Sequence, residues 1–120
     1  MGRQEFINEL QGLDYDPQDL GENRVAFRYT VPVGRLAGQE VSLGFLVADD
    51  FPANPPSGPH VSPRLFPLNS RADPHPNGGV HTSPFGDDWE YWSRPFPNWS
   101  DTNRSVRTYM AHVRHLFDTL

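Results

Sequence analysis

The sequence has no cysteine among its 120 residues. This absence excludes disulfide bonds, thiolate metal sites and every reaction that uses a cysteine nucleophile. Lysine is absent too, so all ten cationic side chains are arginine. Two explanations of that bias stay open: a GC-rich genome that favours arginine codons, or a protein that handles activated acyl groups and carries no ε-amine that could be acylated by mistake.

The sequence also lacks long apolar runs and clustered positive charge. No stretch approaches the roughly 20 apolar residues that cross a bilayer, and the N-terminus has no signal pattern, which predicts a cytoplasmic protein without membrane contact. The formal net charge is −5. Because no segment gathers arginines into a phosphate-binding surface, we do not expect nucleic acid as a partner.

Residues that build stiff loops and a core are abundant instead. Thirteen prolines and ten glycines indicate rigid, irregular connections, because apolar patterning persists between them. Eight phenylalanines, four tyrosines and three tryptophans can bury large areas. A chain of this length suits one core and not two, so we expect a single domain over residues 1–120.

Apolar periodicity predicts two helices, over residues 3–13 and 104–118. The second has an apolar face that should be buried and an arginine-bearing face that should be exposed. The positions expected in the core are Val106, Met110, Val113 and Phe117, and those expected in solvent are Arg107 and Arg114. Four residues before this helix offer a choice of N-caps, namely Ser100, Asp101, Thr102 and Asn103.

Strict alternation of apolar and polar residues predicts an antiparallel pair of strands over residues 24–31 and 40–47, and a short third strand over 57–63. Residues 14–23 are polar and are expected to form a loop. Residues 63–103 contain no convincing regular element, and so long an ordered loop tends to be functional. The order of helix, antiparallel strands, long loop and helix predicts an α+β domain.

Several short motifs occur in a fixed order along the chain. An aromatic-Pro pair, Phe51-Pro52, and then Pro55-Pro56 follow the second strand. His75-Pro76-Asn77 comes next, and a Trp-Ser pair at 99–100 precedes the last helix. This order resembles the ubiquitin-conjugating (UBC)-like fold over roughly residues 3–118. The stretch "DWEYWSRPFPNW" at 88–99 is similar to small prokaryotic members of that superfamily, the group called family E.

The resemblance implies an antiparallel meander sheet with N-terminal and C-terminal helices and a long ordered loop. It also implies a role in a bacterial ubiquitin-like pathway, of the kind that includes anti-phage defence. The implied partners are a ubiquitin-like protein and its adenylating activating enzyme. Since the chain has no catalytic cysteine, the resemblance favours a pseudo-enzyme that acts as a binding or scaffold partner and needs no cofactor.

The loop that would hold the catalytic cysteine carries other candidates for chemistry. His81 lies four residues after Asn77, closer than the family's cysteine lies to its asparagine, and an acyl group on its imidazole would hydrolyse readily. An ester on Ser83 or Thr82 would be stable, but forming it needs a general base at about 3 Å, for which His81 or His75 is the candidate. The alternative for His75 and Asn77 is a structural role in stabilising the loop.

A metal-dependent hydrolase is a third hypothesis. The side chains that could converge on a metal are His60, Asp73, His75 and His81. A second set shares one face of the last helix: His112, His115 and Asp118. No His-Glu-x-x-His motif occurs, and arginines flank the helical set. We therefore expect no metal site.

The resemblance implies that the first helix and its neighbouring loops meet the activating enzyme. The polar side of that helix carries Arg3 and Gln4. Phe51, beside Pro55 and Pro56, is expected to be partly exposed and to serve as an apolar anchor. The tryptophans have two interpretations: Trp89, Trp92 and Trp99 either hold the long loop against the last helix or form an aromatic docking patch.

Overall fold

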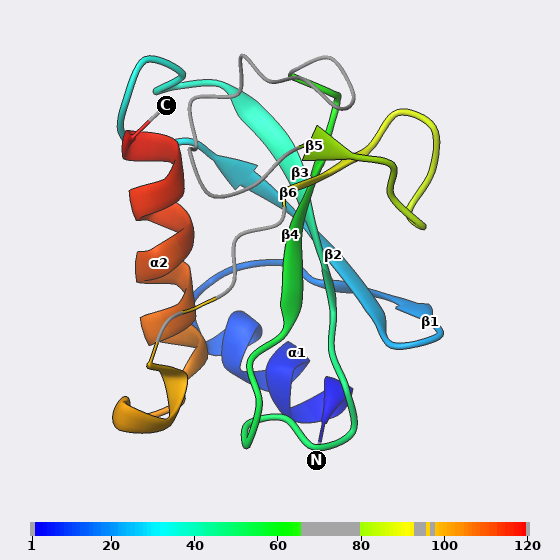
Figure 1. Cartoon of the computed structure of the whole chain (residues 1–120), viewed down its shortest axis with the longest axis vertical. Coiled ribbons are helices and arrows are strands. Elements are labelled where there is room, and N and C mark those ends of the chain that lie inside the picture. The colour runs from blue at the N-terminus through cyan, green and yellow to red at the C-terminus, as the bar shows by residue number, and fades with distance from the viewer. Residues whose placement is uncertain (1, 66–79, 93–95, 97, 120) are drawn as a thin grey trace.

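A computed structural model describes residues 2–65, 80–92, 96 and 98–119 of the chain. Helix α1 (Arg3–Gly12) and helix α2 (Val106–Asp118) accompany a single antiparallel sheet. In Figure 1, α2 stands along one side of the sheet and α1 lies below it near the N-terminus. The fold is therefore α+β, as the sequence predicts. None of the helices described is long and apolar enough to cross a membrane.

The sheet has six strands within the described residues, in the spatial order β1-β2-β3-β4-β6-β5, and every pair is antiparallel. The first four form a meander in chain order. Their bounds, with those of the two short strands, are β1 Gln18–Gly21, β2 Arg24–Thr30, β3 Glu40–Leu46, β4 Ser57–Ser62, β5 Val80–His81 and β6 Glu90–Trp92. The strands expected at 24–31, 40–47 and 57–63 and both expected helices are confirmed to within two residues at each end.

The expectation that residues 14–23 form a loop is wrong, because β1 pairs with β2 through Gln18↔Ala26 and Asp19↔Val25. This edge strand is mostly exposed, so it has no apolar alternation to reveal it. Glu22 and Asn23 form the tight turn between the two strands, and both have a positive φ, 53° for Glu22 and 63° for Asn23. Such a pair of left-handed residues matches the twist of a two-residue hairpin.

The expectation of no regular element over residues 63–103 is also wrong. That stretch contains β5, β6 and a short 3₁₀ helix, η1 (Trp99–Asp101). Strand β6 joins the sheet beside β4, with His60 opposite Tyr91 and Val61 opposite Glu90. Elements of two or three residues are too short to show a period, so their pairing arises from tertiary contacts.

One face of the sheet packs against both helices through a cluster of aromatic rings. Phe45 lies 5.7 Å from the ring of Phe6 in α1 and 5.4 Å from that of Tyr109 in α2. Phe117 lies 5.7 Å from Tyr29 of β2. As predicted, the apolar face of α2 is buried, while Arg107 and Arg114 are exposed.

The start of α2 is held by two side chains. Its N-cap is Ser105, whose hydroxyl accepts a hydrogen bond from the Thr108 amide at 3.1 Å. None of the four caps expected from the sequence takes this place, since Asn103 instead accepts from Ser105. Glu9 of α1 also accepts from the Val106 amide at 3.0 Å. A carboxylate at this end satisfies a free amide and complements the helix dipole.

Candidate functional site

A row of residues crosses the face of the sheet that turns away from α2. Registered pairs connect Gly44 of β3, His60 of β4, Tyr91 of β6 and His81 of β5. Their strand neighbours, such as Val61, belong to the core on the helix side. Because side chains alternate along a strand, the row faces the other way.

The connection from β5 to β6 folds over this row. Figure 1 shows it in yellow, on the side of the sheet opposite α2. Phe85 covers Gly44 so closely that a Cβ at Gly44 would lie 2.7 Å from Cε2 of the Phe85 ring. Trp89 packs on Phe85 with ring centroids 5.0 Å apart. The Phe85 ring can therefore pack against the sheet at this point because residue 44 is a glycine.

His60 is enclosed by this arrangement. Its ring lies 4.8 Å from Phe85 and 4.7 Å from Tyr91, and the residue is only 2% exposed. Burial lowers the pKa of His60 from 6.5 to about 4, because the charged imidazolium cannot keep its hydration there. His60 is therefore neutral at neutral pH.

His60 and Ser83 form a close side-chain pair. The Nδ1 atom of His60 lies 2.8 Å from Oγ of Ser83, which also accepts a hydrogen bond from the Phe85 amide at 3.1 Å. The other ring nitrogen of His60, Nε2, is buried without a hydrogen-bond partner. One nitrogen thus orders the loop, while the other carries an uncompensated desolvation cost.

The cavity beside this pair is small and contains both signs of charge. It has a volume of about 290 Å³ and is lined by Arg64, Thr82, Ser83, Gly86, Asp87 and Trp89. A hydroxyl next to an imidazole can in principle become a nucleophile. Two features weaken that chemistry here: the pKa of His60 makes it a poor base, and no carboxylate orients its Nε2 as in a catalytic triad.

The sequence suggested His81 or His75, and not His60, as the base for Ser83. His81 is exposed on the edge strand β5, and its side chain makes no hydrogen bond within the described residues; its ring is 6.2 Å from that of Tyr91. His75, Asn77 and Asp73 lie outside the described residues. Strand alternation could have placed His60 on the face opposite Val61. No sequence signal pairs it with a serine 23 positions away.

The expectation that Phe51 is a partly exposed anchor is wrong, because its exposed fraction is 0%. Its ring fills the space between α1 and η1, 5.4 Å from Phe6 and 6.4 Å from Trp99. Pro56 is buried as well, and Pro55 is half-buried. The aromatic-Pro pair thus faces the core and cannot provide a surface anchor.

The tryptophans fall into two groups. Trp92 is 1% exposed and packs 5.1 Å from Phe117, so it cannot dock a partner. Trp99 packs on Tyr109 and donates its indole hydrogen bond to the Pro52 carbonyl at 2.8 Å. These two contact α2, as one interpretation expected. Trp89 does not, since it packs on Phe85 and is half-buried.

The polar side of α1 is tied to the hairpin of β1 and β2. Arg3 forms an ion pair with Asp19 at 3.0 Å and donates a hydrogen bond to Asn23 at 3.2 Å. Gln4 bonds only with Asn8 along the same helix and remains exposed. Among the described residues, Leu20 is the one large hydrophobic residue that is exposed, at 43%. Sequence reasoning missed it because it lies in the strand taken for a loop.

The described residues contain no group of three or more histidine and acidic side chains that could hold a metal ion. Of the second set of candidate metal ligands, which lies on α2, His112 packs 4.9 Å from Phe96, and His115 and Asp118 are exposed. His60 directs one nitrogen at Ser83 and buries the other. These side chains therefore give no support to the hypothesis of a metal site.

Comparisons of the chain with protein-family models, with curated proteins and with solved structures found no match.

Proposed function

We propose that the chain is a UBC-like domain of a bacterial ubiquitin-like pathway, which binds a ubiquitin-like protein and its activating enzyme without forming a thioester. The observation that carries this proposal is the order of elements. Helix α1 precedes the meander β1–β4, a proline-rich turn joins β3 to β4, and α2 follows the long connection. The UBC-like fold has the same order of features.

The proline-rich turn supports the proposal because hydrogen bonds fix its position in the fold. Residues 51–56 are held from the α2 side by two hydrogen bonds: the Trp99 indole donates to the Pro52 carbonyl at 2.8 Å, and the Tyr109 hydroxyl donates to the Pro56 carbonyl at 3.2 Å. The aromatic-Pro pair and the Trp-Ser pair, which carry the resemblance in sequence, thus contact each other in space.

The lack of a nucleophilic thiol favours binding over transfer. The chain has no cysteine, and the pKa of the histidine beside Ser83 is too low for an effective base near neutral pH. Recognition of an activating enzyme needs only a surface. We assign it to the exposed side of α1 and to Leu20 of the adjoining hairpin, which replaces Phe51 as the apolar anchor.

The proposal is tested by titrating the chain with an adenylating activating enzyme of a bacterial ubiquitin-like pathway, by isothermal calorimetry. Leu20→Asp should weaken binding about tenfold or more, equal to about 1.4 kcal/mol, because it puts a charge into an apolar contact. Gln39→Asp is the matched control. It adds the same charge at an exposed position of the β2–β3 connection, at the opposite end of β2, and should bind as the unchanged chain does.

Absence of binding by the unchanged chain, or equal loss in both variants, would contradict the proposal. Both variants should keep the thermal midpoint of the unchanged chain, since neither position is buried. A midpoint that fell in Leu20→Asp alone would show that this residue supports the fold and is no surface anchor.

A second candidate function is acyl transfer through Ser83, favoured by its distance of 2.8 Å from Nδ1 of His60. The Ser83 oxygen would attack a thioester carbonyl, forming a C–O bond and breaking the C–S bond. Its proton would pass to His60 and on to the departing thiolate. Incubation with activating enzyme, ATP and ubiquitin-like protein, followed by reducing agent and mass spectrometry, tests this step.

We expect no adduct. An adduct that survives the reducing agent and is lost in Ser83→Ala, but is kept in Thr82→Ala, would establish the carrier and overturn the proposal of binding alone. His81→Ala belongs in the same series, because an acyl group on that exposed imidazole would be lost in this variant and kept in Ser83→Ala.

A further inference from the structure

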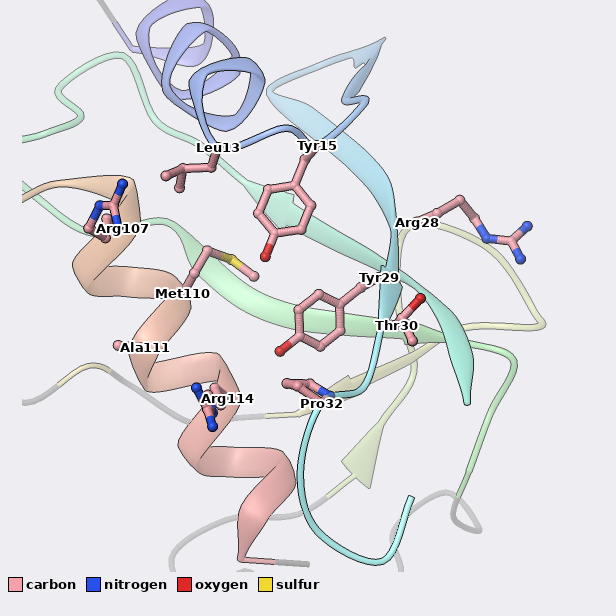
Figure 2. Close-up of a pocket in the computed structure, with 10 residues that line it drawn as sticks. All are labelled: Leu13, Tyr15, Arg28, Tyr29, Thr30, Pro32, Arg107, Met110, Ala111 and Arg114. Carbon is pink, nitrogen blue, oxygen red and sulfur yellow. The ribbon is translucent and has the colours of Figure 1, made fainter. Parts of the chain in front are cut away.

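An open groove of about 580 Å³ lies between α2 and β2, on the helix side of the sheet. Figure 2 shows its walls. Arg107, Met110 and Arg114 come from α2, while Tyr15 and Tyr29 come from the opposite wall, with their hydroxyls directed toward the helix. Ser83 does not line this groove; it lies beside His60 on the opposite face of the sheet.

All the charged side chains that line the groove are positive, although the chain carries a net charge of −5. Arg28, at the rim, points away from the groove and pairs with Glu40 at 3.1 Å. Arg107 and Arg114 form no ion pair within the described residues. Two guanidinium groups therefore remain available for an anion, and arginine binds carboxylates in a two-point geometry.

The tyrosine hydroxyls add neutral donors. Neither the Tyr15 hydroxyl nor the Tyr29 hydroxyl makes a hydrogen bond to another described residue. Burial raises the pKa of both, that of Tyr29 to about 12, although Arg114 opposes the shift. Both phenols thus stay protonated near neutral pH and can donate to an oxygen of a ligand.

The spacing of the charges favours an extended ligand over a compact one. Arg107 and Arg114 are seven residues apart, so their backbones are separated by about 10.5 Å along the helix axis. Met110 and Ala111 form an apolar floor between them. A single phosphate could engage one guanidinium but would leave this floor exposed, whereas a peptide can place an apolar side chain between two carboxylates.

We propose that this groove binds an acidic segment of a partner protein, with carboxylates against Arg107 and Arg114 and an apolar side chain against Met110 and Ala111. Carboxylates there also accept from the phenols of Tyr15 and Tyr29. The inference does not depend on the proposed function, because it uses a different surface and assumes no ubiquitin-like partner.

The test uses fluorescein-labelled peptides in which glutamates flank one or two leucines or phenylalanines at different spacings, with glutamine-containing versions of each as controls. At least one glutamate peptide should bind saturably, and its glutamine version should bind about tenfold or more weakly. Arg107→Gln combined with Arg114→Gln should cause a similar loss. Arg28→Gln, the matched control, should change binding less than about twofold, because its side chain is exposed and paired.

Two further measurements show whether the peptide binds in the groove through its charges. Peptide binding should shift the NMR signal of the Met110 methyl group, and it should weaken as salt rises. The proposal is overturned if no glutamate peptide binds up to about 1 mM, or if the double variant binds as tightly as the unchanged chain. Pyrophosphate binding that needs both arginines, without peptide binding, would also overturn it by showing a site for small anions.

Discussion

At the scale of single residues, His60 is a polar side chain that is almost fully buried, at 2% exposure. It lies between the rings of Phe85 and Tyr91, uses Nδ1 to hold Ser83 and leaves Nε2 buried without a partner. Such a histidine orders the loop while it is neutral and opposes the fold once it is charged. Its role in the proposed binding protein is therefore to fix the β5–β6 connection to the sheet.

The buried imidazole predicts a dependence of stability on pH. The pKa of His60 is about 4 in the folded chain, against 6.5 unfolded. Below pH 6.5 the unfolded chain binds a proton that the folded chain does not, so stability falls as pH drops from about 6.5 toward 4. The full loss is about 3 kcal/mol.

Urea denaturation between pH 7.5 and pH 4 measures this effect. His60→Phe keeps an aromatic ring between Phe85 and Tyr91 and cannot titrate, so its stability relative to the unchanged chain should rise as pH falls. His115→Gln, at an exposed position, is the matched control for the replacement of a histidine. A parallel curve for His60→Phe would contradict the assignment.

Individual residues are where the sequence is least informative. The burial of His60 depends on Phe85, which can approach the sheet because position 44 lacks a Cβ. Three segments of the chain meet there, and no local pattern links them. Phe51 illustrates the same point: its neighbouring prolines favour a rigid turn, but only the space between α1 and η1 decides that the ring turns inward.

At the scale of elements, the contact between α1 and α2 depends on a carboxylate. Glu9 accepts from the Val106 amide in the first turn of α2. Glu9→Ala should lower the free energy of unfolding by about 1–2 kcal/mol, because it loses a hydrogen bond to a charged acceptor and a favourable interaction with the helix dipole. Glu9→Gln should cost less, since the amide oxygen can still accept.

Urea denaturation of both variants at neutral pH tests this order. Glu40→Ala serves as control, because Glu40 pairs with Arg28 on the surface and its removal should cost under about 1 kcal/mol. Equal losses in Glu9→Ala and Glu40→Ala would show that Glu9 acts as an ordinary surface charge.

Most of the elements found from the sequence have a long hydrophobic period; the short strand β4 is the exception. Helix α2 repeats an apolar face over thirteen residues, and β2 and β3 alternate over seven each. Strand β1 was missed because it is a polar edge, and β5 and β6 because they are too short. In each of these cases hydrogen bonding to a neighbouring strand creates the element, and a single segment does not reveal its neighbour.

At the scale of the whole molecule, the core is closed between α1 and the sheet but borders an open groove between α2 and β2. Leu10 is 0% exposed, whereas Met110 is 7% exposed and lines the groove. Leu10→Ala should therefore cost about 3–5 kcal/mol, because it leaves an enclosed cavity, and Met110→Ala about 2 kcal/mol, because the groove merely widens.

Thermal and urea denaturation of the two variants check this difference. A larger loss in Met110→Ala than in Leu10→Ala would mean that the groove is closed in solution, which would also count against a ligand entering it. The α+β class of the fold was predictable from the order of elements, and the meander was implied by the family resemblance. The place of β6 between β4 and β5 was not, because it depends on a return of the chain across the sheet.

Tryptophans lie on both faces of the sheet, so the fluorescence of the protein can report on each face separately. Trp92 and Trp99 are buried on the side of α2, whereas Trp89 packs against Phe85 over the other face. Indole emission moves to longer wavelength when water reaches the ring. A partial opening of the β5–β6 connection would thus change the emission of Trp89 alone, while the other two indoles would respond only when the core itself comes apart.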